Sequence, residues 1–166
     1  MASIDDLKAA FAGESQANRS YLAFAKQADV DGRPQIAKLF RAAAAAETVH
    51  AHAHLAAMGG IGTTAENLAT AIAGEAHEFQ SMYPEFVARA EAEGNRAALR
   101  SFRLAMAVEK THHDLYQAAL AALNAGVDLE TAEIWVCPVC GHTEIGPRPG
   151  KCQVCGAPGA MFSSIA

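Results

Sequence analysis

Unpaired cysteines, long apolar runs and an excess of basic charge are all missing from this sequence. The four cysteines fall in two C-x-x-C pairs, which leaves none for a disulfide framework and favours a reducing compartment. No apolar run approaches the roughly 20 residues of a membrane-spanning helix, and the first residues lack the segments of a signal peptide. The net charge of −5 argues against nucleic acid or an anionic membrane as a partner. We therefore expect a cytoplasmic protein that binds neither.

What the sequence does have is alanine-rich stretches with helical periodicity, and these predict an all-α four-helix bundle with a small C-terminal module. Pro34 suits the first turn of the second helix, and Thr63 or Thr64 can cap the third. Pro84 lies inside the third helix and is expected to kink it or to remove a hydrogen bond. We expect helices over residues of about 4–29, 34–58, 64–93 and 95–126. The expected domains are a four-helix domain over 1–126, a linker over 127–134 and a metal-knuckle module over 135–166.

Two Glu-x-x-His pairs, Glu47/His50 and Glu109/His112, are the most informative motif in the helical part. Residues i and i+3 share one face of a helix, so each pair points a carboxylate and an imidazole in the same direction. Bundles that hold two metal ions in their core carry this motif on two helices and lone carboxylates on the other two. The pattern therefore predicts a metal site between the helices.

Further glutamates lie on the apolar faces of the other two predicted helices, at Glu14 and at the pair Glu75 and Glu78. A carboxylate on a buried face needs a reason, because leaving it without a partner costs several kcal/mol. Four helices that each carry an acid at mid-length favour a bound cation. The alternative is a set of half-exposed ion pairs with no metal.

The C-terminal module contains the knuckles Cys137-Pro138-Val139-Cys140-Gly141 and Cys152-Gln153-Val154-Cys155-Gly156. Two C-x-x-C-G knuckles at this spacing predict one tetrahedral site with four thiolate ligands. So short a module cannot build a stable core alone, so the metal must supply folding energy. Thiolate geometry suits both a structural zinc and a redox iron, and the spacing does not choose between them. Trp135 and Phe162 are expected to form the small core of the module.

Taken together, these motifs make the whole chain resemble the rubrerythrins, which join a ferritin-like di-iron four-helix domain to a rubredoxin-like domain. The match extends from end to end. The resemblance implies a peroxidase that reduces hydrogen peroxide to water in oxidative-stress defence, with electrons relayed through the rubredoxin-like iron from an external reductase. The segments that carry the match are Gly13–Arg19, Glu47 to His50, Gly74–Glu78 leading to Met82–Pro84, Glu109 to His112 and the two knuckles.

The resemblance also implies a role for each site residue. Glu47 and Glu109 match bridging carboxylates, and His50 and His112 match terminal imidazoles. One iron is expected to shift between His50 and Glu78 as the redox state changes, and Tyr21 and Tyr83 to hydrogen-bond ligating carboxylates. The implied ligands of two iron atoms are Glu14, Glu47, His50, Glu75, Glu78, Glu109 and His112. The implied ligands of a third iron, for which zinc is possible, are Cys137, Cys140, Cys152 and Cys155.

The remaining histidines are expected to lie outside the ligand set. His54 follows His50 by about one helical turn and is expected near the site or at its boundary, not as a ligand. His52 and His77 lie off the predicted apolar faces, and His113 faces away from its neighbour His112. His142 follows a knuckle and is expected at the surface.

The connection between the second and third helices is too short for a ferritin-like bundle made within one chain. In such bundles these two helices run parallel, so the connection must return along the bundle. A helix of roughly 24 residues is about 36 Å long, whereas residues 59–64 reach only about 20 Å. Two solutions remain, namely an up-down-up-down monomer and a homodimer that swaps helix pairs. We favour the swapped dimer, because it preserves the handedness of the metal site.

Two other functions remain open at this point. A ferroxidase or iron-handling protein would use the same carboxylate site, although it would have no need of an attached electron relay. A non-enzymatic bundle with a structural zinc ribbon would need no reductase. Iron, manganese and zinc can all occupy carboxylate–imidazole sites, so the sequence does not fix the metal.

Overall fold

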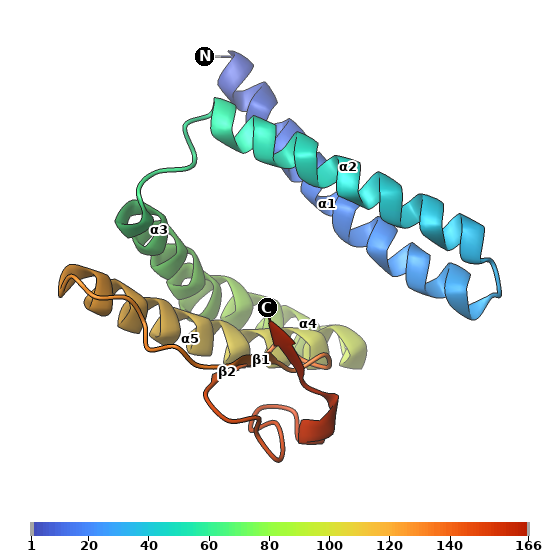
Figure 1. Ribbon diagram of the computed structural model, residues 1–166. Helices are drawn as coiled ribbons and strands as arrows, with labels where there is room; N and C mark the ends of the chain where they lie inside the picture. Colours follow the sequence, from blue (N-terminus) through green and yellow to red (C-terminus); the bar gives the residue numbers. More distant parts are fainter. Residues whose placement is uncertain (1, 166) are drawn as a thin grey trace. The chain divides into compact units, whose positions relative to one another are not determined.

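The computed structural model describes residues 2–165 and divides into two compact units, one up to Gly62 and one from Thr63 onward (Figure 1). The first unit is a helical hairpin. The second contains the remaining helices together with the cysteine-rich module. This division differs from the expected domains, because the module groups with the helices that precede it. The domain boundaries at residues 126 and 135 stay a prediction.

The first unit consists of α1 (Ala2–Val30) and α2 (Pro34–Ala57), joined by a turn in which Gly32 has a φ of 68°. The side chains buried between the two helices are small, as Ala37 and Ala44 show, so the backbones can approach closely. Asn18 is the exception, since it is buried and polar. Its Nδ2 donates to the carbonyl oxygen of Ala44 at 2.6 Å and to Oγ1 of Thr48 at 2.8 Å. These bonds fix the position of α1 along α2.

The third predicted helix is divided into α3 (Thr64–His77), the π-helix η1 (Glu78–Met82) and α4 (Tyr83–Ala92). Thr63 forms a capping box with Glu66 before α3, as one of the two expected caps. Pro84 has no N–H to donate to the carbonyl four residues earlier, which is consistent with the widened turn that precedes it. The predicted disturbance at Pro84 is therefore present, as a π-helix.

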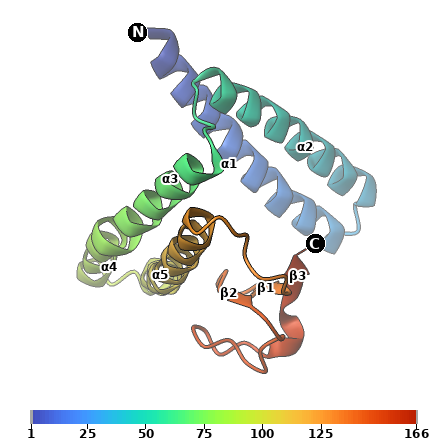
Figure 2. The same ribbon diagram turned by 60° about the vertical axis from the view of Figure 1, so that its left-hand side comes forward.

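The last helix, α5 (Arg96–Asn124), packs against α3, η1 and α4 in the second unit (Figure 2). Asn95 caps it by accepting a hydrogen bond from the N–H of Ala98 at 3.1 Å. Tyr83, Phe86 and Phe102 form an aromatic cluster between α4 and α5, with ring centroids 5.4–6.2 Å apart. This cluster joins the two helices directly after the π-helix.

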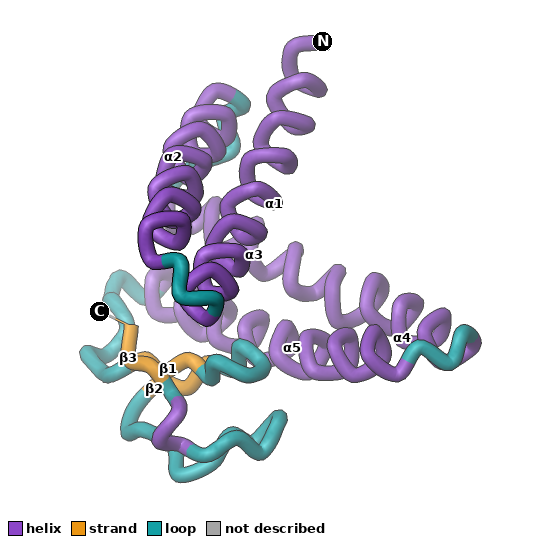
Figure 3. Tube along the Cα trace, turned by 90° about the vertical axis from the view of Figure 1, so that its right-hand side faces the viewer, coloured by secondary structure: helices purple, strands orange, loops and turns teal. Residues whose placement is uncertain are grey.

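The module is built around a three-stranded antiparallel sheet, but loops make up most of it (Figure 3). Its strands are β1 (Ile134–Val136), β2 (Thr143–Ile145) and β3 (Ser163–Ile165), in the order β2-β1-β3, and the short 3-10 helix η2 (Gly159–Met161) precedes β3. Phe162 and two of the cysteines are buried in its core, with Trp135 packed against them, as expected. β2 contacts α5.

Among the described residues, no helix combines the length and the apolar character needed to cross a membrane.

Candidate metal centres

The first cluster of ligand side chains lies in the α1–α2 hairpin. Glu14 comes from α1, and Glu47 and His50 come from α2, with one donor atom from each within 4.8 Å of the others. Nδ1 of His50 is 2.9 Å from Oε2 of Glu47, as the i, i+3 spacing predicts. A hydrogen bond with Glu47 raises the pKa of Glu14, and the same bond lowers the pKa of Glu47. The two carboxyl groups therefore interact, and Glu14 holds its proton more readily than Glu47 does.

The second cluster repeats this arrangement between α3 and α5. Glu75, Glu109 and His112 place their donor atoms within 4.8 Å of one another. Nδ1 of His112 is 2.9 Å from Oε2 of Glu109 and 4.0 Å from Oε2 of Glu75. Burial raises the pKa of Glu75, and the nearby charge of Glu109 raises it further. Two half-buried carboxylates this close repel each other, so the arrangement favours a bound cation.

Each cluster supplies two carboxylates and one imidazole, which is half of the donor set of a di-metal bundle. The six residues are therefore brought together in two groups of three, one in each unit. In each group the donor atoms lie within 4.8 Å of one another, so each group could hold a metal ion. Oxygen and imidazole donors of this kind suit iron, manganese or zinc.

Glu78 and Tyr83 lie close to the second cluster without belonging to it. Glu78 is the first residue of η1 and is half-buried, and burial raises its pKa, as does the charge of Glu75. Burial also raises the pKa of Tyr83, together with the charges of Glu109, Glu78 and Glu75. These shifts place both residues in the electrostatic field of the carboxylates. Within residues 2–165 the Tyr83 hydroxyl makes no hydrogen bond, so its expected bond to a ligand stays a prediction.

Tyr21 lies in the first unit, where its ring packs against those of Phe24 and Phe40, with both centroids 6.2 Å away. Its hydroxyl makes no hydrogen bond to any of the described residues. The role predicted for Tyr21 at a ligating carboxylate is therefore also untested.

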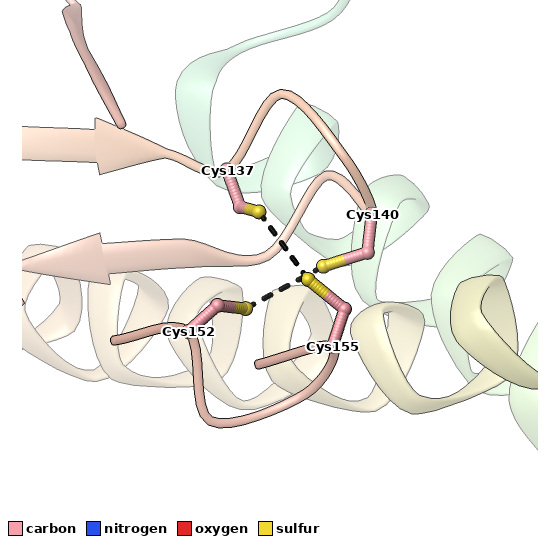
Figure 4. A group of neighbouring side chains, drawn as sticks. All are labelled: Cys137, Cys140, Cys152 and Cys155. Carbon is pink, nitrogen blue, oxygen red and sulfur yellow. Dashed lines mark hydrogen bonds between the residues drawn. The ribbon is translucent and has the colours of Figure 1, made fainter. Parts of the chain in front are cut away.

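The four cysteines converge on a single point (Figure 4). The Sγ atoms of Cys137 and Cys155 are 3.6 Å apart, and so are those of Cys140 and Cys152. A tetrahedral metal with bonds of about 2.3 Å to sulfur requires sulfur atoms about 3.8 Å apart, so the site fits such an ion. Burial opposes ionisation of Cys152, but the N–H groups of Cys155 and Val154 outweigh it and lower its pKa to about 7. Cys152 is thus the thiol most readily converted to the ligating thiolate.

His142 was expected at the surface, and that expectation is wrong. Only 2% of the residue is exposed. Its Nε2 lies 3.0 Å from Oε2 of Glu144 and 3.1 Å from Nε2 of Gln153. Its Nδ1 has no partner in the part of the chain that the structure describes. His142 is therefore part of the packing of the module.

The other histidines stay outside both clusters. His52 and His77 are exposed, and His54 is half-buried, where its charge lowers the pKa of Glu14. His113 turns away from the cluster and packs edge-on against Phe79, with ring centroids 5.3 Å apart.

Sequence reasoning missed Thr143. Its Oγ1 lies 3.1 Å from Nε2 of His112, although the two residues are far apart in the chain. Thr143 follows a knuckle by two residues, and no sequence pattern connects it to a helix.

Comparison with known proteins was consistent with this geometry. The family model described as Rubrerythrin matches residues 5–120. Nigerythrin of Nitratidesulfovibrio vulgaris is 35% identical over 97% of this chain and 85% of its own length. Rubrerythrin-2 of Clostridium acetobutylicum is 32% identical over 97% of this chain and 95% of its own length. Rubrerythrin of Porphyromonas gingivalis is 37% identical over 94% and 86%, respectively.

Solved structures of nigerythrin share the fold. One in a partially reduced state and one in a fully reduced, all-ferrous state each give a TM-score of 0.60 at 34% identity, covering 98% of this chain and 86% of theirs. The expected fold class is thereby confirmed, namely a ferritin-like helical domain with a C-terminal rubredoxin-like four-cysteine domain.

Proposed function

Because this chain belongs to the rubrerythrin family, we propose that it is a non-haem di-iron peroxidase that reduces hydrogen peroxide to water. The observation that carries the proposal is the presence, in one chain, of two carboxylate–imidazole clusters and a four-thiolate site. The balanced reaction takes one hydrogen peroxide, two electrons and two protons to two waters. An external reductase supplies the electrons, and the four-cysteine site passes them on one at a time.

The residues of each cluster have distinct tasks in this proposal. Iron, when bound, would supply the redox equivalents and the Lewis acidity that break the O–O bond. Glu14 and Glu47 would bind the cation as carboxylates, so any proton that Glu14 holds must leave first. Glu75 and Glu109 repel each other, and a bound cation would relieve that repulsion. Glu78 stands half-buried at the start of the π-helix, beside the cluster, which fits a carboxylate recruited when the charge at the site changes. His50 is the imidazole with which it would exchange.

We also propose that the complete site forms between two chains. Each unit holds only half of a di-metal donor set. Only residues 58–63 join α2 to α3, and they reach about 20 Å, whereas the 24 residues of α2 extend about 36 Å. A ferritin-like arrangement of α2 and α3 is therefore out of reach within one chain. A homodimer that pairs α1–α2 of one chain with α3–α5 of the other completes two sites.

Mixing two inactive chains tests this dimer directly. Glu47→Ala damages the first cluster and Glu109→Ala the second. In a swapped dimer of one chain of each kind, one site receives both defects and the other receives none. Random pairing therefore restores metal loading to about a quarter of the sites. If the mixture stays as empty as either variant alone, or if the protein is a metal-loaded monomer, the swap is refuted.

Metal analysis and a visible spectrum of protein made in iron-replete medium test the activity. The proposal expects about three iron atoms per chain, two with the carboxylates and one with the cysteines, and rapid oxidation of the reduced protein by peroxide. Colourless protein with zinc in the cysteine site would remove the electron relay. Oxidation of Fe(II) by oxygen that needs no reductase would favour the ferroxidase instead.

A further inference from the structure

One hydrogen bond connects the cysteine module to the carboxylate–histidine cluster within the second unit. Nε2 of His112 on α5 lies 3.1 Å from Oγ1 of Thr143, the first residue of β2. On the other side of the same ring, Nδ1 is 2.9 Å from Oε2 of Glu109. The imidazole is thus held at both nitrogens, one by the cluster and one by the module.

The hydroxyl group of Thr143 can serve as an acceptor for His112. Its own hydrogen is directed to the carbonyl oxygen of Gly141, 3.3 Å away, which leaves its lone pairs for an N–H of His112. A neutral imidazole has one N–H, so placing it on Nε2 leaves Nδ1 with a lone pair. Nδ1 is the nitrogen that faces Glu109 and Glu75, where a cation would be bound. A metal-bound imidazole is commonly fixed by such a bond at its other nitrogen.

Packing holds the module in place for this contact. Gly141 lies against Val108, a residue of α5 that is 2% exposed, and a Cβ atom at Gly141 would be 3.8 Å from Cγ1 of Val108. Val108 precedes Glu109 in the chain. Residues 125–133 connect α5 to β1 and can span about 30 Å. His112 is only about 18 Å from the C-terminal end of α5, so this connection is long enough for the module to reach it.

We propose that Thr143 is a positioning residue, which fixes the tautomer and the orientation of His112 so that Nδ1 is free to bind the metal. The proposal rests on the proposed use of this cluster as a metal site. Its consequence is that the four-cysteine module prepares a ligand of the other centre in the same chain. The module from Cys137 to Cys155 needs its own metal to fold. Metal binding by the cysteines is then coupled to the metal affinity of the carboxylate cluster.

The first cluster provides an internal comparison. His50 makes the same 2.9 Å contact with its glutamate, but its Nε2 has no partner among residues 2–165. Its side chain is 55% exposed, against 26% for that of His112. Of the two motif histidines, His112 is the one whose Nε2 contacts a described residue outside its own motif.

The test compares Thr143→Val, which removes the hydroxyl at nearly constant shape, with Thr143→Ser, which keeps it. Thr70→Val is the matched control, because Thr70 is exposed on α3 and its hydroxyl bonds only within its helix. The full-length chain is prepared with zinc in the cysteine site and with the carboxylate site stripped by mild chelation. Titration of the stripped protein with Co²⁺ reports the affinity of the carboxylate site. Nitrogen-15 NMR after zinc is added to that site reports the tautomer of His112, because the bound cation then replaces the carboxylate of Glu109 as the partner of Nδ1.

In the zinc-loaded wild-type protein we expect His112 to be the Nε2–H tautomer, with Nδ1 bound to the metal. In Thr143→Val we expect a shifted Nε2 resonance, because its hydrogen bond is lost, and a Co²⁺ affinity lower by about tenfold or more, with both restored in Thr143→Ser. Circular dichroism and retention of the cysteine-bound zinc show whether Thr143→Val is folded. If Thr143→Val fails to fold, the NMR spectrum of the wild-type protein still tests the proposal. An Nδ1–H form of His112 in that spectrum would overturn it.

An unchanged Nε2 resonance and affinity in folded Thr143→Val would also overturn it, as would an equal loss of affinity in Thr70→Val. The failure of the peroxidase proposal is distinguishable from these outcomes. A wild-type protein that binds metal but does not react with peroxide would refute the activity and leave the role of Thr143 intact.

Discussion

The two Glu-x-x-His motifs have the same local geometry and different surroundings. In both, Nδ1 of the histidine lies 2.9 Å from Oε2 of the glutamate three residues earlier. His112 also contacts Thr143 from the cysteine module, and the half-buried Glu78 lies near it, whereas His50 has neither neighbour within its own unit. The spacing in the sequence therefore determines the pair, and contacts from distant segments determine what the pair can do. Three predictions test how far this difference extends.

The largest expected effect comes from Cys152→Ala. With one thiolate lost, the four-cysteine site can no longer supply the about 10 kcal/mol or more that such a metal contributes to folding. We expect the module to lose both its metal and its sheet, which metal analysis and circular dichroism measure. His112 should then lose its fixed tautomer in the imidazole NMR spectrum, while the spectrum of His50 stays unchanged.

Lys151→Ala is the control for this change, because Lys151 is an exposed neighbour with no thiolate. An unchanged His112 signal in Cys152→Ala, once the module has unfolded, would show that the two centres are independent.

An intermediate effect is expected from Glu78→Ala. If Glu78 is recruited during turnover and is not a permanent ligand, the rate of oxidation by peroxide should fall by about tenfold or more, while the metal affinity changes by about threefold at most. Stopped-flow absorbance measures the rate, and titration measures the affinity. Glu85→Ala is the matched control, because the side chain of Glu85 is 70% exposed on α4. Equal losses of rate and affinity would contradict the proposed exchange.

The smallest effect is on the stability of the metal-free protein. The pKa of Glu75 is raised above its ordinary value of 4.5, mainly by burial. The folded state favours the protonated form of Glu75. This stabilisation is therefore fully present below pH 4.5 and is lost as the pH rises through the raised pKa of Glu75. Glu75→Gln, which stays neutral, should raise the melting temperature of the metal-free protein at pH 7 by about 2 °C and leave it unchanged at pH 4.

Glu14→Gln sharpens the comparison, because the pKa of Glu14 is raised chiefly by its hydrogen bond with Glu47, which glutamine can still donate. We expect a smaller change than for Glu75→Gln. An equal rise at pH 4 and pH 7 for either variant would assign the effect to packing and not to charge.

Local rules made much of this molecule predictable from its sequence. Helical periodicity located the helices, Thr63 and Asn95 cap two of them at the turns, and the i, i+3 rule placed both histidines beside their glutamates. The knuckle spacing predicted the convergence of the four cysteines. In each of these cases the partners lie within one helical turn or one short loop, or belong to a known metal-binding pattern.

The features that the sequence did not reveal depend on tertiary packing. His142 is polar and follows a turn, which favours the surface, yet it is buried and contacts Gln153 from the other knuckle. Thr143 reaches His112 only because the module packs on Val108 of α5. Pro84 indicated a disturbance in the third helix, but whether a kink or a wider turn results depends on the side chains packed around it.

The π-helix η1 changes the direction in which the side chains of α4 point around the helix axis. A wide turn accommodates about one extra residue, and one residue corresponds to about 100° of rotation around the axis. Without it, Met82 would continue the apolar face through Phe79, whereas the structure turns Tyr83 toward Phe86 and Phe102. Straightening residues 78–82 into a regular α-helix without removing a residue would therefore rotate Tyr83 by about 100°, away from the carboxylates, whereas deleting one of these residues would remove the wide turn and keep the direction of Tyr83. At this segment the type of turn, together with the number of residues, sets the direction of Tyr83.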